Sequence, residues 1–565
     1  MSNCYVSITI SVGNCEHTSG TFVDRPAGIG TPAHGVSVMA APGTRPDEAP
    51  TAGAEMVPAA RSEGAPTAGS ERAPVAGELG KGGRYLVLAI CCMSLFIVGL
   101  DTTILNVGLP SLKHDLHAPD SGLQWTIDAY GLVIASLLLF SGSMADRLGR
   151  RRVFRTGLTL FSAGSLLCSL APGLGWLIAF RMVQAVGGSM LNPVAMAIIT
   201  NTFTDRRERA RAIGVWGAVM GLSMALGPVL GGVLVDGIGW RAIFWINVPI
   251  GLTAMVLTGR YVPESTAPRA RRFDPAGQLL VAATLGTLTY AIIEAPSAGW
   301  TSTQTLVMFV IAAIALLGLV LVESRRDEAL LDTRFFRSVP FSGATAIAVC
   351  AFAAMGGFLF LNSLYLQNVR GYSALHAGLM TLPMAAFAAI MPPISGRLVG
   401  SYGPRPSLIA AGLALPASGL LLTFLGPHTS LALLVCAYVL FGVGFGMVNA
   451  PITNTAVSGM PVAQAGVAAA VASTSRQIGM ALGVAILGSV AARQVAGRAS
   501  IDPTSAPAWW IMVGCGLAIG VLGVLTTGSW ARGTAARTAA LFDTPVRRPE
   551  LAETLTTAGP DRLTA

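Results

Sequence analysis

Runs of mostly apolar residues, separated by short polar segments, recur along the chain from residue 86 to residue 529. A helix of about twenty residues spans the roughly 30 Å of hydrocarbon in a bilayer, so each run predicts a membrane-spanning helix. The pattern therefore predicts an all-α polytopic membrane protein whose first partner is the lipid bilayer. The fourteen predicted helices cover residues 86–109, 122–144, 153–171, 175–199, 210–235, 243–261, 277–294, 304–323, 341–366, 375–398, 406–425, 429–455, 464–491 and 508–529.

The two ends of the chain have a different composition. Residues 1–80 are rich in Ala, Pro, Gly, Thr and Glu, and the sequence APTAG occurs there at 49–53 and again at 65–69. Such a segment buries too little apolar surface to offset its chain entropy, so we expect a disordered tail. Met39 is a second possible start of the chain. Residues 531–565 are expected to form a second polar tail.

Lys and Arg residues are distributed unevenly among the loops. Cytoplasmic loops of membrane proteins are enriched in these residues, and here alternate loops carry most of them. We therefore expect a multi-pass protein of the cell membrane with both termini in the cytoplasm. The opposite loops carry only Lys113, Arg241, Arg370, Arg493 and Arg498.

The composition excludes several classes of function. The chain is 53% hydrophobic and 12% charged, against about 25% charged in an ordinary soluble protein. Its net charge of +9 comes mainly from loop arginines, so we expect no nucleic-acid partner. No loop is long enough for a soluble catalytic domain, and neither a phosphate-binding loop of the G-x-x-x-x-G-K-[ST] type nor metal-ligand spacing occurs. We expect no catalytic residue, metal or cofactor, and an ion gradient as the energy source.

Four ionisable residues lie well inside predicted helices: Asp101, Asp128, Arg181 and Arg476. At about 1.5 Å of rise per residue, the first three share one depth in the membrane. Charges at such positions are costly and mark functional sites, and an Arg can hold a carboxylate ionised or release it. Two alternatives stay open: a static ion pair that fixes helix packing, and a solvated helix end for Asp128. The sequence names no partner for Arg476.

The segment GLSMALGPVLGG combines glycine and proline inside one predicted helix. Glycines let neighbouring helices approach closely, and a proline bends the helix that contains it. This composition suits helix contacts that form and separate, although ordinary tight packing is the alternative. The residues concerned are Gly221, Gly227, Pro228, Gly231 and Gly232.

The segment GSMADRLGRRR, residues 142–152, joins the second and third predicted helices. Its glycines permit a tight turn, its arginines hold the loop near anionic headgroups, and its aspartate can meet an Arg or a helix N-terminus. A weaker copy, GRLVGSYGPRP, follows the tenth helix at 396–406. The repeat indicates that helices 1–6 and 9–14 are related halves, with helices 7 and 8 inserted at the periphery.

These motifs resemble the major facilitator superfamily and, within it, the fourteen-helix drug:proton antiporter family, over about residues 85–530. The matches are LDTTILNVGLP at 100–110, G-x-x-x-D-R-x-G-R-R at 142–151 and G-x-x-x-x-x-G-P-x-x-G-G at 221–232. WRAIFWINVPIG at 240–251 and RQIGMALGVAILG at 476–488 are also similar to family segments. The family's R-x-x-Q-G motif is matched by Arg181 and Gln184, whereas Ala185 replaces its glycine.

The resemblance implies two six-helix bundles, residues 85–262 and 339–530, with residues 263–338 inserted between them. The bundles would rock around a central cavity, and the protein would act as a monomer. Asp101, Arg181 and Asp128 would couple transport to protons, and the fifth helix would make the protein an exchanger. The loop residues would latch the inner gate; they are Gly142, Asp146, Arg147, Gly149, Arg150 and Arg151.

The resulting hypothesis is a proton-coupled exporter of bulky amphipathic drugs or antibiotics, including a role in self-resistance. A proton-coupled transporter of a specific metabolite or nutrient is the alternative. A membrane-embedded transferase would need paired acids for a metal diphosphate, which we do not find, and a receptor would not need three charges at one depth. Candidates for the substrate cavity are Trp125, Tyr130, Gln184, Asn362, Tyr365, Gln367 and Arg476, although several could instead be interfacial residues.

Overall fold

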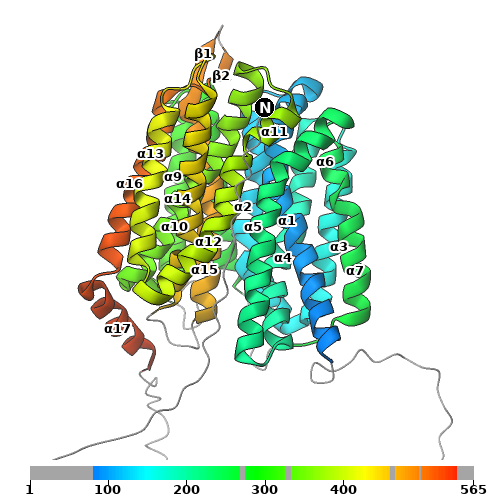
Figure 1. Cartoon of the computed structure of the whole chain (residues 1–565), viewed down its shortest axis with the longest axis vertical. Helices are drawn as coiled ribbons and strands as arrows, with labels where there is room; N and C mark the ends of the chain where they lie inside the picture. The colour runs from blue at the N-terminus through cyan, green and yellow to red at the C-terminus, as the bar shows by residue number, and fades with distance from the viewer. Residues whose placement is uncertain (1–79, 267–273, 326–332, 459–464, 496–497, 544–565) are drawn as a thin grey trace, which may run out of the picture. The chain divides into compact units, whose positions relative to one another are not determined.

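A computed structural model describes residues 80–266, 274–325, 333–458, 465–495 and 498–543, and almost all of them are helical (Figure 1). The first nine helices are α1 (Lys81–Leu116), α2 (Asp120–Leu148), α3 (Arg150–Ser169), α4 (Leu174–Thr202), α5 (Arg206–Gly237), α6 (Ala242–Trp245), α7 (Asn247–Tyr261), α8 (Pro275–Ala298) and α9 (Thr303–Ser324). The remaining elements are η1 (Thr333–Arg337), α10 (Val339–Leu364), η2 (Tyr365–Val369), α11 (Ala374–Met380), α12 (Leu382–Tyr402), α13 (Arg405–Leu422), α14 (Leu431–Val457), α15 (Ala465–Ala491), β1 (Ala492–Val495), β2 (Arg498–Ile501), α16 (Ala506–Thr526) and α17 (Ser529–Asp543).

Each of the fourteen predicted spans coincides with one helix or with two adjoining helices, so the predicted fold class is confirmed. Thirteen helical stretches in the described part of the chain are long and apolar enough to cross a membrane. The remaining predicted span is α3, whose first turns carry Arg150, Arg151, Arg152 and Arg155 and are therefore more polar. It nevertheless packs along α4 and α7 as one member of the bundle.

Local chemistry sets several helix ends. The Asp205 carboxylate accepts hydrogen bonds from the backbone N–H groups of Arg207 and Glu208, both at 2.9 Å, and so caps the first turn of α5. Ser302 and Ser430 cap α9 and α14 in the same manner. At the C-terminal end of α2, Gly149 has φ of 103°, a conformation that residues with a Cβ rarely adopt.

The described helices form two bundles with a boundary between them (Figure 1). In the N-terminal half, α1 packs on α4, α5 and α7, while α4 also contacts α2 and α3. In the C-terminal half, α10 packs on α14, α15 and α16, while α14 also contacts α12 and α13. Contacts of α2 with α15, of α5 with α11 and α12, and of α1 with α10 join the halves.

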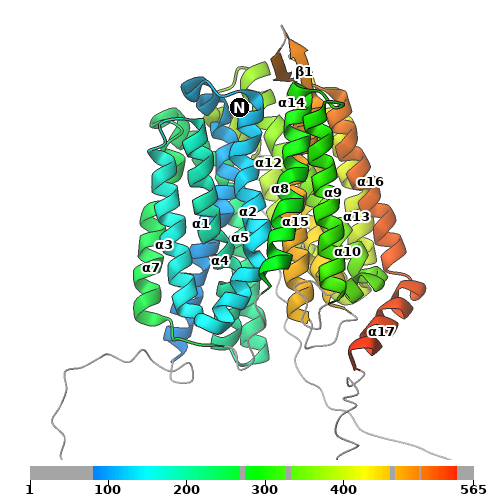
Figure 2. The same ribbon diagram turned by 180° about the vertical axis from the view of Figure 1, so that it is seen from behind.

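The inserted helices lie outside both bundles. Helix α9 packs mainly on α8 and exposes a row of large apolar side chains, as a lipid-facing helix does; they include Leu306, Val310, Ile314 and Leu317. Helix α8 contacts both α2 and α15, beside the boundary between the halves (Figure 2). Ser489 of α15 donates a hydrogen bond to the carbonyl oxygen of Ile292 at 2.6 Å. Helix α8 therefore bridges the two halves from outside.

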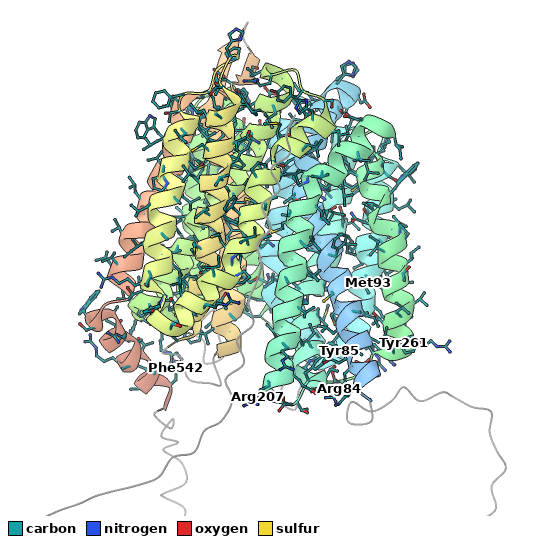
Figure 3. The ribbon with its side chains drawn as sticks, viewed as in Figure 1. Arg84, Tyr85, Met93, Arg207, Tyr261 and Phe542 are labelled. Atoms are coloured by element: carbon teal, nitrogen blue, oxygen red, sulfur yellow. The ribbon has the colours of Figure 1, made fainter. Side chains whose placement is uncertain are left out.

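The bundle has two chemically different ends. At the first, which we call the Arg-rich end, lie the start of α1, the α2–α3 turn, the start of α5 and α17; Arg84, Arg207, Tyr261 and Phe542 are labelled there (Figure 3). At the other, the hairpin end, the antiparallel strands β1 and β2 pair Ala492 with Ile501. Neither the hairpin nor α17 was predicted, and α17 falls partly on the expected polar tail. It docks on the start of α10, where Val339 N–H donates to Thr534 Oγ1 at 3.0 Å.

Candidate functional site

A buried ion pair joins α1 to α4. Asp101 and Arg181 are each 1% exposed, and Arg181 Nη1 lies 2.5 Å from Asp101 Oδ2. Arg181 Nε also donates to the carbonyl oxygen of Thr126 in α2 at 3.2 Å, and the guanidinium carbon lies 4.1 Å from the ring centre of Tyr130. The arginine therefore joins α4, on which it lies, to α1 and α2.

Neutral side chains bond the second oxygen of Asp101. Gln184 Nε2 donates to Asp101 Oδ1 at 2.8 Å, and Asn247 Nδ2 donates to the same oxygen at 3.1 Å. Asn247 also donates to Ser165 Oγ at 3.2 Å. Gln184 was expected to line a substrate cavity, and the structure places its amide on the carboxylate instead. Asn247 and Ser165 were missed, although Asn247 stands in the WINVPIG segment that resembles the family.

This network can hold a charge inside the membrane. Taking two ions out of water costs several kcal/mol for each ion, and their attraction offsets this only when the other lone pairs are also bonded. Both oxygens of Asp101 have such partners, and Arg181 has three acceptors in Asp101, Gln184 and Thr126. A proton added to Asp101 would weaken each of these bonds, so the protonation state and the helix packing are linked.

Asp128 lies on the face of α2 at the boundary between the halves. It is fully buried, and neither of its oxygens has a hydrogen-bond partner among the described residues. It borders a cavity of about 20 Å³, room for about one water molecule, together with Tyr130 and Arg181. Gln477 and Met480 of α15 form the opposite wall. The three charges that the depth argument grouped therefore lie around one site.

Four other candidates for the substrate cavity lie elsewhere. Trp125 faces α8, where its indole N–H donates to Glu294 Oε1 at 3.0 Å. Asn362 accepts a hydrogen bond from Tyr438 inside the C-terminal half, and Tyr365 donates to the carbonyl oxygen of Gly426 at 2.9 Å. Gln367 donates to the carbonyl oxygen of Val107 at 2.9 Å, across the boundary. Their polar groups are satisfied within the protein, which the sequence pattern could not reveal.

Arg476 of α15 points between α14 and α10. Its Nη2 donates to Thr453 Oγ1 of α14 at 2.7 Å, and its guanidinium carbon lies 5.9 Å from the ring centre of Phe352 in α10. Its Nε is buried and has no hydrogen-bond partner among the described residues. The next residue, Gln477, borders the small cavity with Asp128.

The glycine and proline segment of α5 forms two different contacts. A Cβ on Gly231 would lie 2.8 Å from the carbonyl oxygen of Ile104, so α5 and α1 touch through their backbones. A Cβ on Gly232 would lie 2.7 Å from the carbonyl oxygen of Ala374 in the other half. Gly227 faces Thr103, whose hydroxyl donates to the carbonyl oxygen of Met224 at 3.2 Å.

Pro228 and Gly221 complete the segment. The carbonyl oxygen of Pro228 meets Gly378 of α11, which lacks a side chain there. The expectation of close backbone approach is wrong for Gly221, because no neighbouring atom lies within 4 Å of a Cβ built on it. The close contacts of α5 therefore belong to its hairpin-end portion, and the Gly221 side of the helix faces open space.

The loop between α2 and α3 forms ion pairs within its own half. Asp146 Oδ1 accepts from Arg150 Nη2 at 3.0 Å, and the Arg151 backbone N–H donates to Glu264 at 3.0 Å. The Glu264 carboxylate occupies the space beside Gly149, 2.6 Å from where a Cβ would stand. Gly142 is loosely packed, with Pro193 3.9 Å from its Cβ position. The loop motif gave no signal for Glu264, which follows α7. Arg147 has a partner as well.

Hydrogen bonds tie the halves together at the hairpin end. Asp236 of α5 accepts from the backbone N–H groups of Ala374 at 3.1 Å and Leu375 at 2.9 Å. Asp120 at the start of α2 accepts from the Ile501 N–H at 2.7 Å and pairs with Lys113 at 2.5 Å. Sequence reasoning missed both acids, because carboxylates are common at helix ends.

A cavity of about 580 Å³ lies beside these contacts at the hairpin end. It is bordered by Lys113, Asp120 and Gln124 of the N-terminal half, by Pro296 of α8 and by Ser500 of β2. Gln124 Nε2 also donates to the carbonyl oxygen of Val484 in α15 at 3.3 Å. Within the described residues, no three His, Cys, Asp or Glu side chains gather as a metal site would require.

Comparison with known proteins places this geometry in a family. The family model of the Major Facilitator Superfamily matches residues 91–484. The Multidrug resistance protein Stp of Mycobacterium tuberculosis is 40% identical over 420 residues, covering 74% of this chain and 78% of that protein. The Tetracenomycin C resistance and export protein of Streptomyces glaucescens is 34% identical over 417 residues, covering 74% and 77%.

A solved structure agrees with the fold. The crystal structure of the peptide transporter POT in complex with sulfate superposes with a TM-score of 0.56 over 81% of this chain and 95% of that chain, at 16% identity. This likeness concerns the fold alone, whereas the family model and the two relatives confirm the resemblance seen in the sequence. The chain belongs to the major facilitator superfamily of membrane transporters and, within it, to the drug:proton antiporter family.

Proposed function

We propose that the protein exports bulky amphipathic molecules in exchange for protons that enter down their gradient. The observation that carries the proposal is the buried Asp101–Arg181 pair beside the unpartnered carboxyl group of Asp128. A proton-driven exchanger needs carboxyl groups that can change charge within the membrane. The resistance and export named for the two relatives supports a drug or antibiotic as the cargo.

Alternating access is the mechanism that we propose for the export step. The bonds of Asp236 and Asp120 to the other half support a state that is closed at the hairpin end. At the Arg-rich end, Asp146 and Glu264 instead bond within the N-terminal half. If the Arg-rich end faces the cytoplasm, as its arginines favour, cargo enters this state from the cytoplasm.

Proton coupling would use Arg181 as the shared partner of two carboxyl groups. Arg181 bonds Asp101 and also borders the cavity on which Asp128 lies. When Asp128 loses its proton, its charge attracts the guanidinium, and when Asp101 gains one, that pair weakens. Movement of Arg181 would shift α4 against α1 and α2, the helices that it now holds together.

The remaining parts of the proposal concern the protein in its cell. We place it in the cell membrane as a monomer, with both termini in the cytoplasm. The loop of Asp146 and Arg150 would latch the Arg-rich end when that end closes. An inward proton-coupled transporter of a metabolite remains the second transport function, because the same fold and charge pair would serve it.

Proteoliposomes with an imposed pH gradient test the proposal. We expect purified protein to move an amphipathic dye against its gradient, with protons moving the opposite way, and to stop when an ionophore collapses the pH difference. The Asp128→Asn variant should fold and bind dye, and it should no longer export dye when a pH gradient is imposed. Dye export that persists without any proton gradient would contradict the coupling, and inward accumulation of a metabolite would favour the second function.

A further inference from the structure

The C-terminal half contains almost no acidic residues. Between residues 339 and 530 the sequence has a single one, Asp502, which lies in the loop after β2 at the hairpin end. The basic residues of the helices and loops in this half therefore lack the acids that usually accompany them. Among these basic residues, Arg476 lies near the middle of a membrane-spanning helix, α15 (Ala465–Ala491).

Arg476 lies among the inner helices of the C-terminal half. Its two contacts come from α14 and α10, through Thr453 Oγ1 at 2.7 Å and the Phe352 ring at 5.9 Å. Helix α10 packs on α1, and α15 packs on α2, so both belong to the boundary between the halves. Thr453 is itself exposed and Arg476 is partly exposed, so the hydrogen bond between them lies at an accessible position.

In the part of the chain that the structure describes, no acid neutralises the charge of Arg476. No carboxylate lies within ion-pair distance of it among the described residues, and its Nε has no acceptor. By contrast, Arg181 has three acceptors, one of which is the carboxylate of Asp101. A cation held in the membrane without a counter-ion is costly, and water and one hydroxyl offset that cost only in part. The site therefore has an unfilled place for an acceptor.

We infer that the cargo carries a planar anionic group, such as a phenolate or carboxylate, and that Arg476 binds it. The inference rests on the proposed function, because it takes the space between the halves as the cargo's path. The guanidinium presents a flat fork of N–H donors that fits such a group, while the nearby Phe352 ring offers an apolar surface for the body of the molecule.

The other charges around the path agree with this preference. Asp101 is bonded to Arg181, so this pair adds little net charge. Among the described residues, Asp128 forms no ion pair, and in its protonated form it leaves Arg476 as the net charge of the site. A permanently cationic drug would face this arginine, and the membrane-spanning helices of the C-terminal half have no acid to bind the drug.

Binding of two dyes with the same skeleton tests the inference. The methyl ester of fluorescein is an anion in mildly alkaline buffer, and the matching diamino-xanthylium methyl ester is a cation. Purified full-length protein in nanodiscs, with no pH gradient, is titrated with each dye and followed by fluorescence anisotropy. We expect the wild type to bind the anion more tightly, since a hydrogen bond to a charged group favours binding by about tenfold or more.

Variants of Arg476 then identify the responsible group. Arg476→Gln should weaken binding of the anionic dye by about tenfold and leave binding of the cationic dye unchanged or improved. Arg476→Lys, which keeps the charge without the planar fork, should retain part of the preference. Arg397→Gln is the matched control, because Arg397 is an exposed arginine of α12 in the same half.

Each other outcome has a clear meaning. A wild type that binds the cation more tightly overturns the inference, and so does an Arg476→Gln variant that loses both dyes equally while remaining folded by size-exclusion chromatography. If Arg476→Gln does not fold, the inference is tested by the wild type's preference between the two dyes and by the change of that preference in Arg476→Lys. A wild type that binds neither dye would count against the proposed export of amphipathic molecules and against the inference with it.

Discussion

Asp236 of α5 accepts a hydrogen bond from the Leu375 backbone N–H at 2.9 Å, and this bond crosses the boundary between the two halves. The same carboxylate accepts from the Ala374 N–H, so it covers the first free amides of α11. Directly beside it, Gly232 lets the α5 backbone approach Ala374. A single turn of α5 thus supplies both the close contact and the charge that hold the hairpin end together.

Replacing Asp236 with Ala should open the hairpin end more often. An exposed carboxylate bonded to helix amides is worth about 1 kcal/mol, so the ratio of closed to open forms should fall about fivefold. Single cysteines on α5 and α11, tested for cross-linking or spin-label distances, would measure the shift. The Asp115→Asn variant is the matched control, since Asp115 bonds Trp240 at 3.0 Å within one half. If Asp115→Asn changes the ratio of closed to open forms equally, Asp236 has no specific role in closing the hairpin end.

Glycines of α5 should differ sharply in their tolerance of a methyl group. Gly231→Ala would place its Cβ 2.8 Å from the Ile104 carbonyl oxygen, so α5 and α1 must separate, at a cost of about 1 to 3 kcal/mol. Gly221→Ala meets open space and should change stability by less than about 0.5 kcal/mol. Thermal unfolding of both variants in detergent, with the transport rate of each, would compare them. Equal destabilisation would contradict the contact between α5 and α1.

The sequence predicted those parts of the fold that the membrane itself enforces. Every backbone polar group in the bilayer must form a hydrogen bond within the protein. A single apolar run of twenty residues meets this requirement by forming an α-helix. A glycine in the sequence shows only that the helix has no side chain at that position. Whether a neighbouring helix approaches at that position depends on the packing of the folded protein. The prediction consequently held for Gly231 and Gly232 and was wrong for Gly221.

The sequence predicted the charged residues of the candidate site better than the neutral ones. Asp101, Arg181 and Asp128 stood out because few ionisable residues lie deep in a predicted helix. Gln184 and Asn247 are neutral, so nothing in the sequence tied them to Asp101. Asn362 and Tyr365 looked like cavity residues because polar side chains can either face a cavity or bond inside a bundle, and their partners belong to distant segments.

Changing the loop aspartate should affect the rate of transport rather than the affinity for cargo. Asp146 bonds Arg150 at the Arg-rich end, away from the small cavity at Asp128, and the pair is partly exposed. Asp146→Asn should therefore lower the turnover of dye export severalfold while changing dye affinity by less than about 1 kcal/mol, the upper end for an exposed ion pair. Transport and equilibrium binding on the same preparation would separate the two. A large loss of affinity at normal turnover would contradict a gating role.

The last prediction separates proton coupling from a purely structural role of the Asp101–Arg181 pair. Asp101→Asn leaves Arg181 buried without its counter-ion, and breaking a buried pair in this way costs about 3 to 5 kcal/mol. We therefore expect less folded protein and no gradient-driven export. The double variant Asp101→Asn with Arg181→Gln removes both charges and keeps groups that can hydrogen-bond. It should recover most of the lost stability, because no uncompensated charge remains.

Export normalised to folded protein then decides between the two roles. If the pair only fixes helix packing, the stable double variant should also recover dye export driven by a pH gradient. If Asp101 must gain and lose a proton, export should remain absent although folding and dye binding return. Conservative replacement of Arg181 by Lys is the control for charge, since it keeps a cation beside Asp101 but loses the Nε bond to Thr126. Gradient-driven export by the double variant at the wild-type rate would remove Asp101 from the coupling mechanism.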